Sequence, residues 1–423
     1  MKIEYIYSAC IVITTDDCKI LCDPWFTQGA FGGTWYHFPY KKVEPQNIGF
    51  CDYIYVSHIH PDHYDYAWLK DYLNIYSDSK VITANWFRSN PLFMKMKRDG
   101  IVNHEVDELD NKSTNIKIFP HDNGSVSDID SALVVTSPNG QIVNMNDCIW
   151  DKNFYDKVEK FCREKNVSNS FKVGLFSYTS AGPYPHTYWY GTDELNEKSE
   201  MHKGKFLDHY KNKIKSIQCD INIPFAGQFL LGGDSSIYND FRGICDAVEV
   251  LEIDSKALVL KEYGQGYVDL NKKKAFGVRN KLFDINEIKK SIEIISKFKP
   301  DYEKKISQLV AAEIRLKSLL DISFKKAFQR LNSKIQYLYF LNIDNKEFYT
   351  LDLFEGSITQ GKNIKNDSDF VIHEIFIKRN LLVSLLLGLE HWDNAEKGSM
   401  YRSHRNPDKF IRKAQSFLHF FCI

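Results

Sequence analysis

One short stretch after an apolar strand constrains this chain more than any other feature. Residues 56–66 read VSHIHPDHYDY and place His58, His60, Asp62 and His63 directly after the run YIYV. Side chains two residues apart on an extended backbone point the same way, so His58 and His60 can bind one cation together. Imidazole and carboxylate groups without a thiolate suit zinc, iron(II) or manganese, and argue against a closed structural zinc site. The stretch therefore predicts a metal centre at a strand end.

The proline inside this stretch indicates how the ligands are divided. Pro61 keeps His60 extended and suits the first turn of a helix. Asp62 and His63 would then lie in that turn, displaced from the first pair and free to serve a second cation. A solvated polar loop is the alternative, which explains any one of these histidines better than it explains the spaced set.

Composition and charge exclude several classes of protein. Lys plus Arg and Asp plus Glu both number 55, so no net charge favours nucleic acid or an anionic membrane as a partner. Nine cysteines without a disulfide framework predict reduced thiols and a cytoplasmic location. The first residues, MKIEYIYSACIVIT, lack a signal-peptide pattern, and the run LLVSLLLGL is about half the ~20 residues that a membrane-spanning helix needs. We expect a small-molecule substrate; the oligomeric state stays open.

The pattern of apolar residues divides the chain into three expected parts. Residues 1–250 alternate β-branched runs with turns and helical stretches, and Pro138–Gly140 marks a hairpin, so this part is a layered α/β domain. Residues 251–335 include lysine-rich helical stretches and are expected to form a helical connector. Residues 336–423 are expected to form a small α+β domain.

The pattern His-x-His-x-Asp-His after an apolar strand resembles the signature of the metallo-β-lactamase superfamily. The resemblance implies an αββα sandwich, with two sheets packed face to face and helices outside. It says less about the reaction, because function resides in the site and not in the scaffold.

The same resemblance implies further ligands from later strand ends. His121 in IFPHDNG matches the third histidine of the first metal, and Asp147 in IVNMNDC matches the carboxylate that bridges both metals. An exposed loop histidine and a helix N-cap are the respective alternatives. Asp23 in KILCDPW is expected behind a histidine ligand, where it would orient the ring. His186 in GPYPHTYWYG is the weakest match, for the second metal, so one or two metal ions remain open.

Three further stretches resemble one branch of the superfamily, the CMP-N-acetylneuraminate hydroxylase-like proteins. They are CDPWFTQGAFGGTW, then TSAGPYP followed by NKIKSIQCDINIPFAGQF, and finally HWDNAEKGSMYRSHRNPDKF. The resemblance implies an iron-dependent mono-oxygenase that acts on a small polar metabolite. That hydroxylase also carries a Rieske cluster, which needs Cys-x-His and Cys-x-x-His, and no cysteine of this chain has a histidine two or three positions later.

The missing cluster leaves the reaction open. A separate electron-transfer protein could supply electrons to one or two iron ions, or the enzyme could be a zinc- or manganese-dependent hydrolase of phosphodiester, lactone or amide bonds. In a hydrolase, Asp62 or Asp147 would hold the attacking hydroxide. Arg402 and Arg405 in YRSHRNPDK could bind an anionic substrate group, or could form a solvated basic turn.

Overall fold

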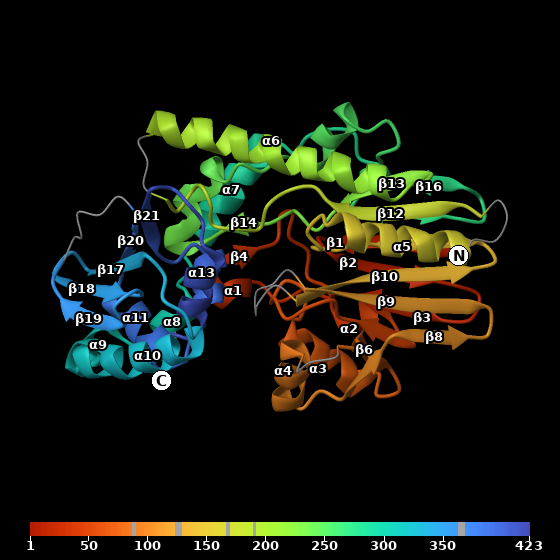
Figure 1. The fold of residues 1–423 in the computed structure, drawn as a ribbon. Helices are drawn as coiled ribbons and strands as arrows, with labels where there is room; N and C mark the ends of the chain where they lie inside the picture. Colours follow the sequence, from red (N-terminus) through yellow and green to blue (C-terminus); the bar gives the residue numbers. More distant parts are fainter. Residues whose placement is uncertain (87–89, 123–128, 166–169, 189–191, 363–368) are drawn as a thin grey trace.

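The computed structural model describes residues 1–423 except 87–89, 123–128, 166–169, 189–191 and 363–368. Two parts lie side by side, and the sheets of the amino-terminal part are separate from the carboxy-terminal sheet (Figure 1). In the described part of the chain, no helix is both long and apolar enough to cross a membrane.

The amino-terminal part contains two large sheets. The first has the strand order β16-β15-β1-β2-β3-β5-β6-β7. Its strands are β1 (Lys2–Tyr7), β2 (Cys10–Thr14), β3 (Lys19–Cys22), β5 (Tyr53–Tyr55), β6 (Lys80–Ala84), β7 (Asn103–Val106), β15 (Gly266–Asp269) and β16 (Lys274–Phe276). The second has the order β13-β12-β11-β10-β9-β8. Its strands are β8 (Glu108–Asn111), β9 (Thr114–Asp122), β10 (Ile129–Ser137), β11 (Gly140–Asn144), β12 (Lys172–Ser177) and β13 (Ile221–Phe225).

Strand β10 shows how the layers arise from the sequence. Successive side chains of a strand point to opposite faces. Leu133 and Val135 therefore enter the core between the two sheets, whereas Ala132 and Val134 face the outer helices. The hairpin predicted at Pro138–Gly140 joins β10 to β11, with Ser137 opposite Gly140.

Helices cover both outer faces. The first sheet is covered by α2 (Pro45–Ile48), α3 (Tyr66–Ile75) and α4 (Pro91–Asp99), and the second by α5 (Lys152–Glu164) and α6 (Thr192–Ser216). Helix α5 buries Phe154, Tyr155 and Val158 against the second sheet. The order helix, sheet, sheet, helix confirms the predicted αββα sandwich.

The expected helical connector over 251–335 differs from the structure at both ends. Strands β15 and β16 lie inside that range and extend the first sheet, with Lys2 of β1 opposite Asp269. Both strands are short, and the lysine-rich turn between them leaves little apolar alternation, which is why the pattern did not indicate strands. Helices α7 (Ile285–Ile295), α8 (Asp301–Lys305) and α9 (Gln308–Glu313) follow, while α10 (Leu316–Leu331) packs into the carboxy-terminal core. The division into three domains stays a proposal.

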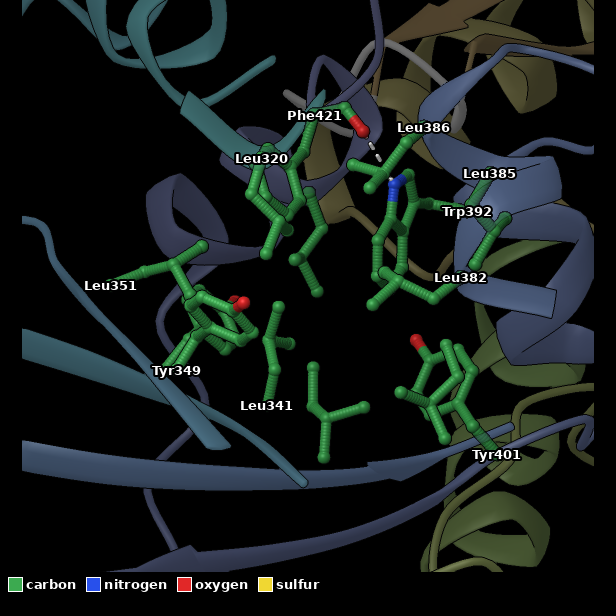
Figure 2. Close-up of a cluster of buried hydrophobic side chains, with 14 of the residues drawn as sticks. Leu320, Leu341, Tyr349, Leu351, Leu382, Leu385, Leu386, Trp392, Tyr401 and Phe421 are labelled. Carbon is green, nitrogen blue, oxygen red and sulfur yellow. Dashed lines mark hydrogen bonds between the residues drawn. The ribbon is translucent and has the colours of Figure 1, made fainter. Parts of the chain in front are cut away.

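The carboxy-terminal part is a five-stranded sheet with helices. Its strands, in the order β19-β18-β17-β20-β21, are β17 (Tyr337–Ile343), β18 (Glu347–Asp352), β19 (Ser357–Gln360), β20 (Val371–Ile377) and β21 (Arg402–Asn406). Helices α11 (Arg379–Leu386) and α12 (Trp392–Lys397) lie between β20 and β21 in the chain, and α13 (Arg412–His419) follows β21. Figure 2 shows the core between them, where Leu320, Leu341 and Trp392 converge. Trp392 also donates a hydrogen bond from Nε1 to the Phe421 carbonyl at 2.8 Å, which fixes α12 in this core.

Short elements of the amino-terminal part contact the carboxy-terminal part. They are α1 (Ala30–Gly33), β4 (Trp35–Tyr36), which pairs with β14 (Leu230–Leu231), and the 3-10 helix η1 (Gly233–Phe241). Trp35 Nε1 donates to the Lys397 carbonyl at 3.0 Å, and Ser235 Oγ donates to the Ser399 carbonyl at 2.9 Å. The end of helix α12 is thereby tied to β4 and η1. A second 3-10 helix, η2 (Ala247–Glu252), packs within the sandwich.

Candidate metal centre

The histidine stretch forms a tight turn at the end of strand β5. The amides of His63 and Tyr64 both donate to the His60 carbonyl, at 3.0 and 2.8 Å. Helix α3 begins only at Tyr66, where Asp65 caps it by accepting the Trp68 amide at 3.1 Å. Asp62 and His63 thus lie in the turn before the helix and not in its first turn as expected, because Asp65 supplies the cap.

This turn and the end of strand β11 bring the candidate ligands together. One potential ligand atom each from His58, His63 and Asp147 lies within 4.8 Å of the other two. His58 Nε2 and His60 Nδ1 face each other at 2.6 Å. His63 Nε2 lies 3.5 Å from Asp62 Oδ2 and 3.4 Å from Asp147 Oδ2. Five of the expected ligands therefore share one site, with two histidines on one side and a histidine with two carboxylates on the other.

Each of the three histidines has a carboxylate near its outer ring nitrogen. His58 Nδ1 lies 3.4 Å from Asp130 Oδ1, His60 Nε2 lies 3.2 Å from Asp393 Oδ2, and His63 Nδ1 lies 3.2 Å from Asp23 Oδ2. The Ser57 hydroxyl lies closer still to His58 Nδ1, at 2.9 Å. A carboxylate behind a histidine ligand fixes the proton on the outer nitrogen and directs the inner nitrogen to the metal. The three carboxylates are therefore placed where they would orient the three rings.

Asp23 lies at the end of β3 in the position expected for an orienting residue. Its Oδ1 accepts the Ser57 amide at 2.7 Å, and its Oδ2 accepts from Asn146 Nδ2 at 2.5 Å. The side chain is completely buried, so these contacts replace solvent. Asp23 therefore connects the histidine turn to the residue before Asp147. Its orienting role remains a prediction.

His121 lies at the expected strand end beside this group. It ends strand β9 opposite Asp130, the residue that contacts His58, and its ring packs on Phe154 with centroids 4.1 Å apart. Its ligand atoms are outside the three-residue group of His58, His63 and Asp147. Its role as a ligand stays a prediction.

Three predicted site residues have other surroundings. His186 Nε2 lies 2.7 Å from Ser399 Oγ, and its ring lies against Tyr238, so the structure does not place it in the ligand group. Arg405 donates to Asp408 Oδ1 at 2.8 and 3.1 Å and lies over the Tyr188 ring. Arg402 is in strand β21, opposite Phe376.

Neither Arg402 nor Arg405 lines the cavity of about 460 Å³ that opens beside His60. Arg405 lines a separate cavity of about 540 Å³, together with Tyr184 and Lys198. For His186, the sequence around the residue could not show its surroundings, because Tyr238 and Ser399 are distant in the chain.

Burial and neighbouring charges shift the pKa values of several residues of the site. Burial lowers the pKa of His58 well below its usual value, and His63 and His60 add to the effect. Burial also opposes the charge of His63, but Asp62, Asp147 and Asp23 outweigh it and raise its pKa well above the usual value. Burial and the neighbouring Asp147 raise the pKa of Asp130. The site thus contains an excess of buried carboxylate, which a cation would neutralise.

The donor atoms fit a metal ion. Asp147 Oδ1 is buried and has no hydrogen-bond partner among the described residues, although a quarter of its side chain is exposed. His58 Nε2 and His60 Nδ1 lie 2.6 Å apart, so either one ring donates to the other or, with both protons on the outer nitrogens, two lone pairs face a cation. Cys148, the next residue after Asp147, is buried and is not in the group of ligand atoms formed by His58, His63 and Asp147. Imidazole and carboxylate donors of this kind suit iron, zinc or manganese.

A cavity opens beside His60 between the two parts of the chain. Its volume is about 460 Å³. Aromatic side chains of Trp25, Phe31, Tyr64 and Tyr66 line it, together with Lys95, Arg98, His60, His391, Asp393 and His419. Of the candidate ligands, only His60 belongs to the lining. A small molecule bound there would contact the metal centre from the His60 side.

Asp130 and Asp393 are contacts that the sequence pattern did not single out. Asp130 lies in the stretch SDIDSALVV, and its place opposite His121 follows only from the register of β9 and β10. Asp393 lies about 330 residues beyond His60 in the sequence, and only the packing of α12 on α1 brings it near.

Comparisons with known proteins agree with this architecture. Residues 2–154 match the family model described as "Beta-lactamase superfamily domain". The cytidine monophosphate-N-acetylneuraminic acid hydroxylase of Danio rerio is 24% identical over 249 residues, which are 56% of this chain and 40% of that protein. The inactive human counterpart is 25% identical over 251 residues, 56% of this chain and 47% of that protein. The chain thus spans less than half the length of these curated relatives.

A solved isothiocyanate hydrolase from Delia radicum gut bacteria superimposes with a TM-score of 0.42 at 14% identity, covering 64% of this chain and 98% of that one. The family match covers both β5 and the whole histidine motif, and the two face-to-face sheets with outer helices supply the scaffold. This chain therefore carries a beta-lactamase superfamily domain, and its amino-terminal part has the metallo-β-lactamase fold.

Proposed function

We propose that the protein is a non-haem iron oxygenase that hydroxylates a small polar metabolite. The observation that carries the proposal is the position of His60, which belongs to a buried histidine and carboxylate cluster and also lines a cavity of about 460 Å³. Cavities of a few hundred Å³ suit small-molecule ligands. The similarity to curated hydroxylases over 56% of the chain supports the oxidative form of this chemistry.

His58, His60, Asp62, His63 and Asp147 would hold one or two metal ions, with His121 at the adjacent strand end. When bound, iron would supply the redox chemistry of hydroxylation. Asp23 and Asp130 would hold the rings of His63 and His58 in place. The aromatic walls would exclude water from the cavity, and Lys95 and Arg98 would favour an anionic group on the substrate.

Electrons would come from outside the residues described. All nine cysteines are free in the structure, and none has the spacing of a Rieske ligand. A separate electron-transfer protein is the partner that this reaction would need.

The proposal is tested on protein purified under reducing, oxygen-free conditions. We expect iron by elemental analysis and oxygen uptake that depends on both a reductant and a small anionic metabolite. His58→Ala and His63→Ala should abolish iron binding and oxygen uptake. His104→Ala is the matched control, because His104 is an exposed histidine on the edge strand β7. Full zinc occupancy without oxygen-dependent turnover would overturn the proposal.

A metal-dependent hydrolase is the second candidate. The specific observation in its favour is the lack of a cysteine and histidine pattern for electron transfer, since hydrolysis needs no electrons. A zinc or manganese ion would lower the pKa of a bound water, and Asp62 or Asp147 would hold that water through a carboxylate oxygen. Turnover of a phosphodiester, lactone or amide without oxygen or reductant would favour this candidate.

A further inference from the structure

We propose that Asp393 of the carboxy-terminal part is a positioning residue for His60, so that the metal centre is completed across the boundary between the two parts. This inference rests on the proposed function, because it takes the histidine cluster as a metal centre. The inference assigns to Asp393, on helix α12, a role in orienting His60, a candidate metal ligand of the amino-terminal sandwich.

The His60 ring is held between two different groups. Its Nδ1 faces His58 Nε2 at 2.6 Å, and its Nε2 lies 3.2 Å from Asp393 Oδ2. The distance between His60 Nε2 and Asp393 Oδ2 is that of an ion pair, but the two groups are not aligned as in a hydrogen bond. A proton on Nε2 would be stabilised by the carboxylate and would leave the Nδ1 lone pair directed inward. Asp393 thus favours the tautomer that a metal requires on the His58 side.

The other two histidines also have a carboxylate near the outer nitrogen, within the sandwich, although His58 Nδ1 lies closer to the Ser57 hydroxyl, at 2.9 Å. Asp130 lies at the outer nitrogen of His58, and Asp23 lies at the outer nitrogen of His63. His60 is the histidine of the motif whose outer carboxylate comes from the carboxy-terminal part. The repetition of one pattern around three rings argues that the contact with Asp393 serves the centre, and not only the contact between the two parts.

The surroundings of Asp393 keep it in place. Its side chain is 7% exposed and forms an ion pair with Lys397, while His419 Nε2 lies 3.7 Å from its Oδ1. The adjacent Trp392 is buried in the carboxy-terminal core and fixes the start of α12. A structural role as partner of Lys397 is the competing explanation, so the experiment must separate the two.

The experiment compares metal affinity in two Asp393 variants and two control variants of the full chain. Zinc affinity is measured by competition with a chromophoric chelator, starting from metal-free protein whose folding is checked by thermal unfolding. We expect Asp393→Asn to weaken zinc binding by about 10–100-fold, the usual effect of losing such a carboxylate. Asp393→Glu should recover part of the loss.

Two control variants remove neighbouring contacts and spare the pair of His60 with Asp393. Asp408→Asn removes a carboxylate of the carboxy-terminal part that contacts Tyr184 and Lys198 of the sandwich, and it should leave zinc affinity unchanged. Lys397→Met removes the ion-pair partner and a positive charge, so it should leave zinc affinity unchanged or raise it.

A spectroscopic measurement reports the tautomer directly. In cobalt(II)-loaded protein, the ring N–H of His60 should give a paramagnetically shifted, exchangeable proton signal. We expect this proton to exchange faster with solvent in Asp393→Asn, because its acceptor is weakened.

The outcomes separate the inference from the proposed function. Wild-type zinc affinity and proton exchange in Asp393→Asn, together with lost affinity in His60→Ala, would overturn the role of Asp393 alone. Equal losses in Asp393→Asn and Lys397→Met would also overturn it in favour of the structural role. Unchanged affinity in His58→Ala and His60→Ala would instead defeat the metal centre itself.

Discussion

Asp23 Oδ2 lies 3.2 Å from His63 Nδ1, and the same buried carboxylate accepts the Ser57 amide and the Asn146 side chain. Asp23 has a positive φ of 42°, so a strained backbone position supports these contacts. One side chain therefore joins the end of β3, the histidine turn and the residue before Asp147.

Asp23→Ala should weaken both the fold and metal binding. The change leaves the Ser57 amide and the Asn146 side chain without this acceptor, which costs about 1–3 kcal/mol per buried group. It also removes the carboxylate behind His63, which should weaken metal binding about 10–100-fold. Urea denaturation and chelator competition measure the two effects. Asp52→Ala is the control. Asp52 lies directly before β5 and accepts the amide of Lys19 at the start of β3, so its loss should affect stability and not metal affinity.

Gly398→Ala should loosen the contact between the two parts of the chain. An added Cβ would lie 2.7 Å from Thr34 Oγ1 and 2.9 Å from the Phe31 carbonyl oxygen, and that backbone atom cannot turn aside as the end of a flexible side chain can. Gly204→Ala is the matched control, because no atom lies within 4 Å of its added Cβ. Only Gly398→Ala should increase proteolysis between the parts. Equal proteolysis in the two variants would contradict this prediction.

His37 should make the protein less stable in acid. Burial lowers the pKa of His37 to about 3 from the usual 6.5. Neither ring nitrogen has a hydrogen-bond partner in the described chain, and the ring stacks on Tyr7 at 4.1 Å. Between pH 6.5 and 3 the unfolded chain binds a proton at His37 that the folded chain does not, so stability falls as the pH falls.

Phenylalanine at this position should remove that part of the pH dependence. We expect His37→Phe to retain on the order of 2–4 kcal/mol more of its neutral-pH stability than the wild type does when both are brought to about pH 3.5. Denaturant unfolding at a series of pH values measures the difference. His104→Phe should leave the slope unchanged, because that histidine is exposed. Parallel curves for wild type and His37→Phe would refute the assignment.

Metal removal should destabilise the amino-terminal part. Asp23, Asp62 and Asp130 are buried, and without a cation their charges oppose one another. A metal that binds only the folded state stabilises it by about 2.7 kcal/mol at a hundredfold excess over the Kd. We therefore expect the midpoint of thermal unfolding to rise on adding zinc or iron(II), and to rise less at pH 5.5 than at pH 7.5, since protons compete for the histidines. His58→Ala should show no such rise.

The comparison of sequence with structure separates two kinds of information. The motif of His58, His60, Asp62 and His63 predicted the sandwich through its resemblance to the metallo-β-lactamase signature, and its short spacings predicted that the side chains share one strand end. Alternating apolar residues likewise predicted the layers around β10 and β11. The same resemblance pointed to Asp147, which lies 3.4 Å from His63.

Other features depended on contacts between distant segments. The outer carboxylate Asp130 depends on the register of β9 with β10, and Asp393 depends on the packing of α12 against α1. His186 carries suitable chemistry, but Ser399, 213 residues further along the chain, holds it in other surroundings. The sequence by itself determined which side chains can bind a metal, because that is a property of the groups and their local spacing. Only the tertiary structure decided which carboxylates stand behind them and where the cavity opens, because packing between the two parts sets those distances.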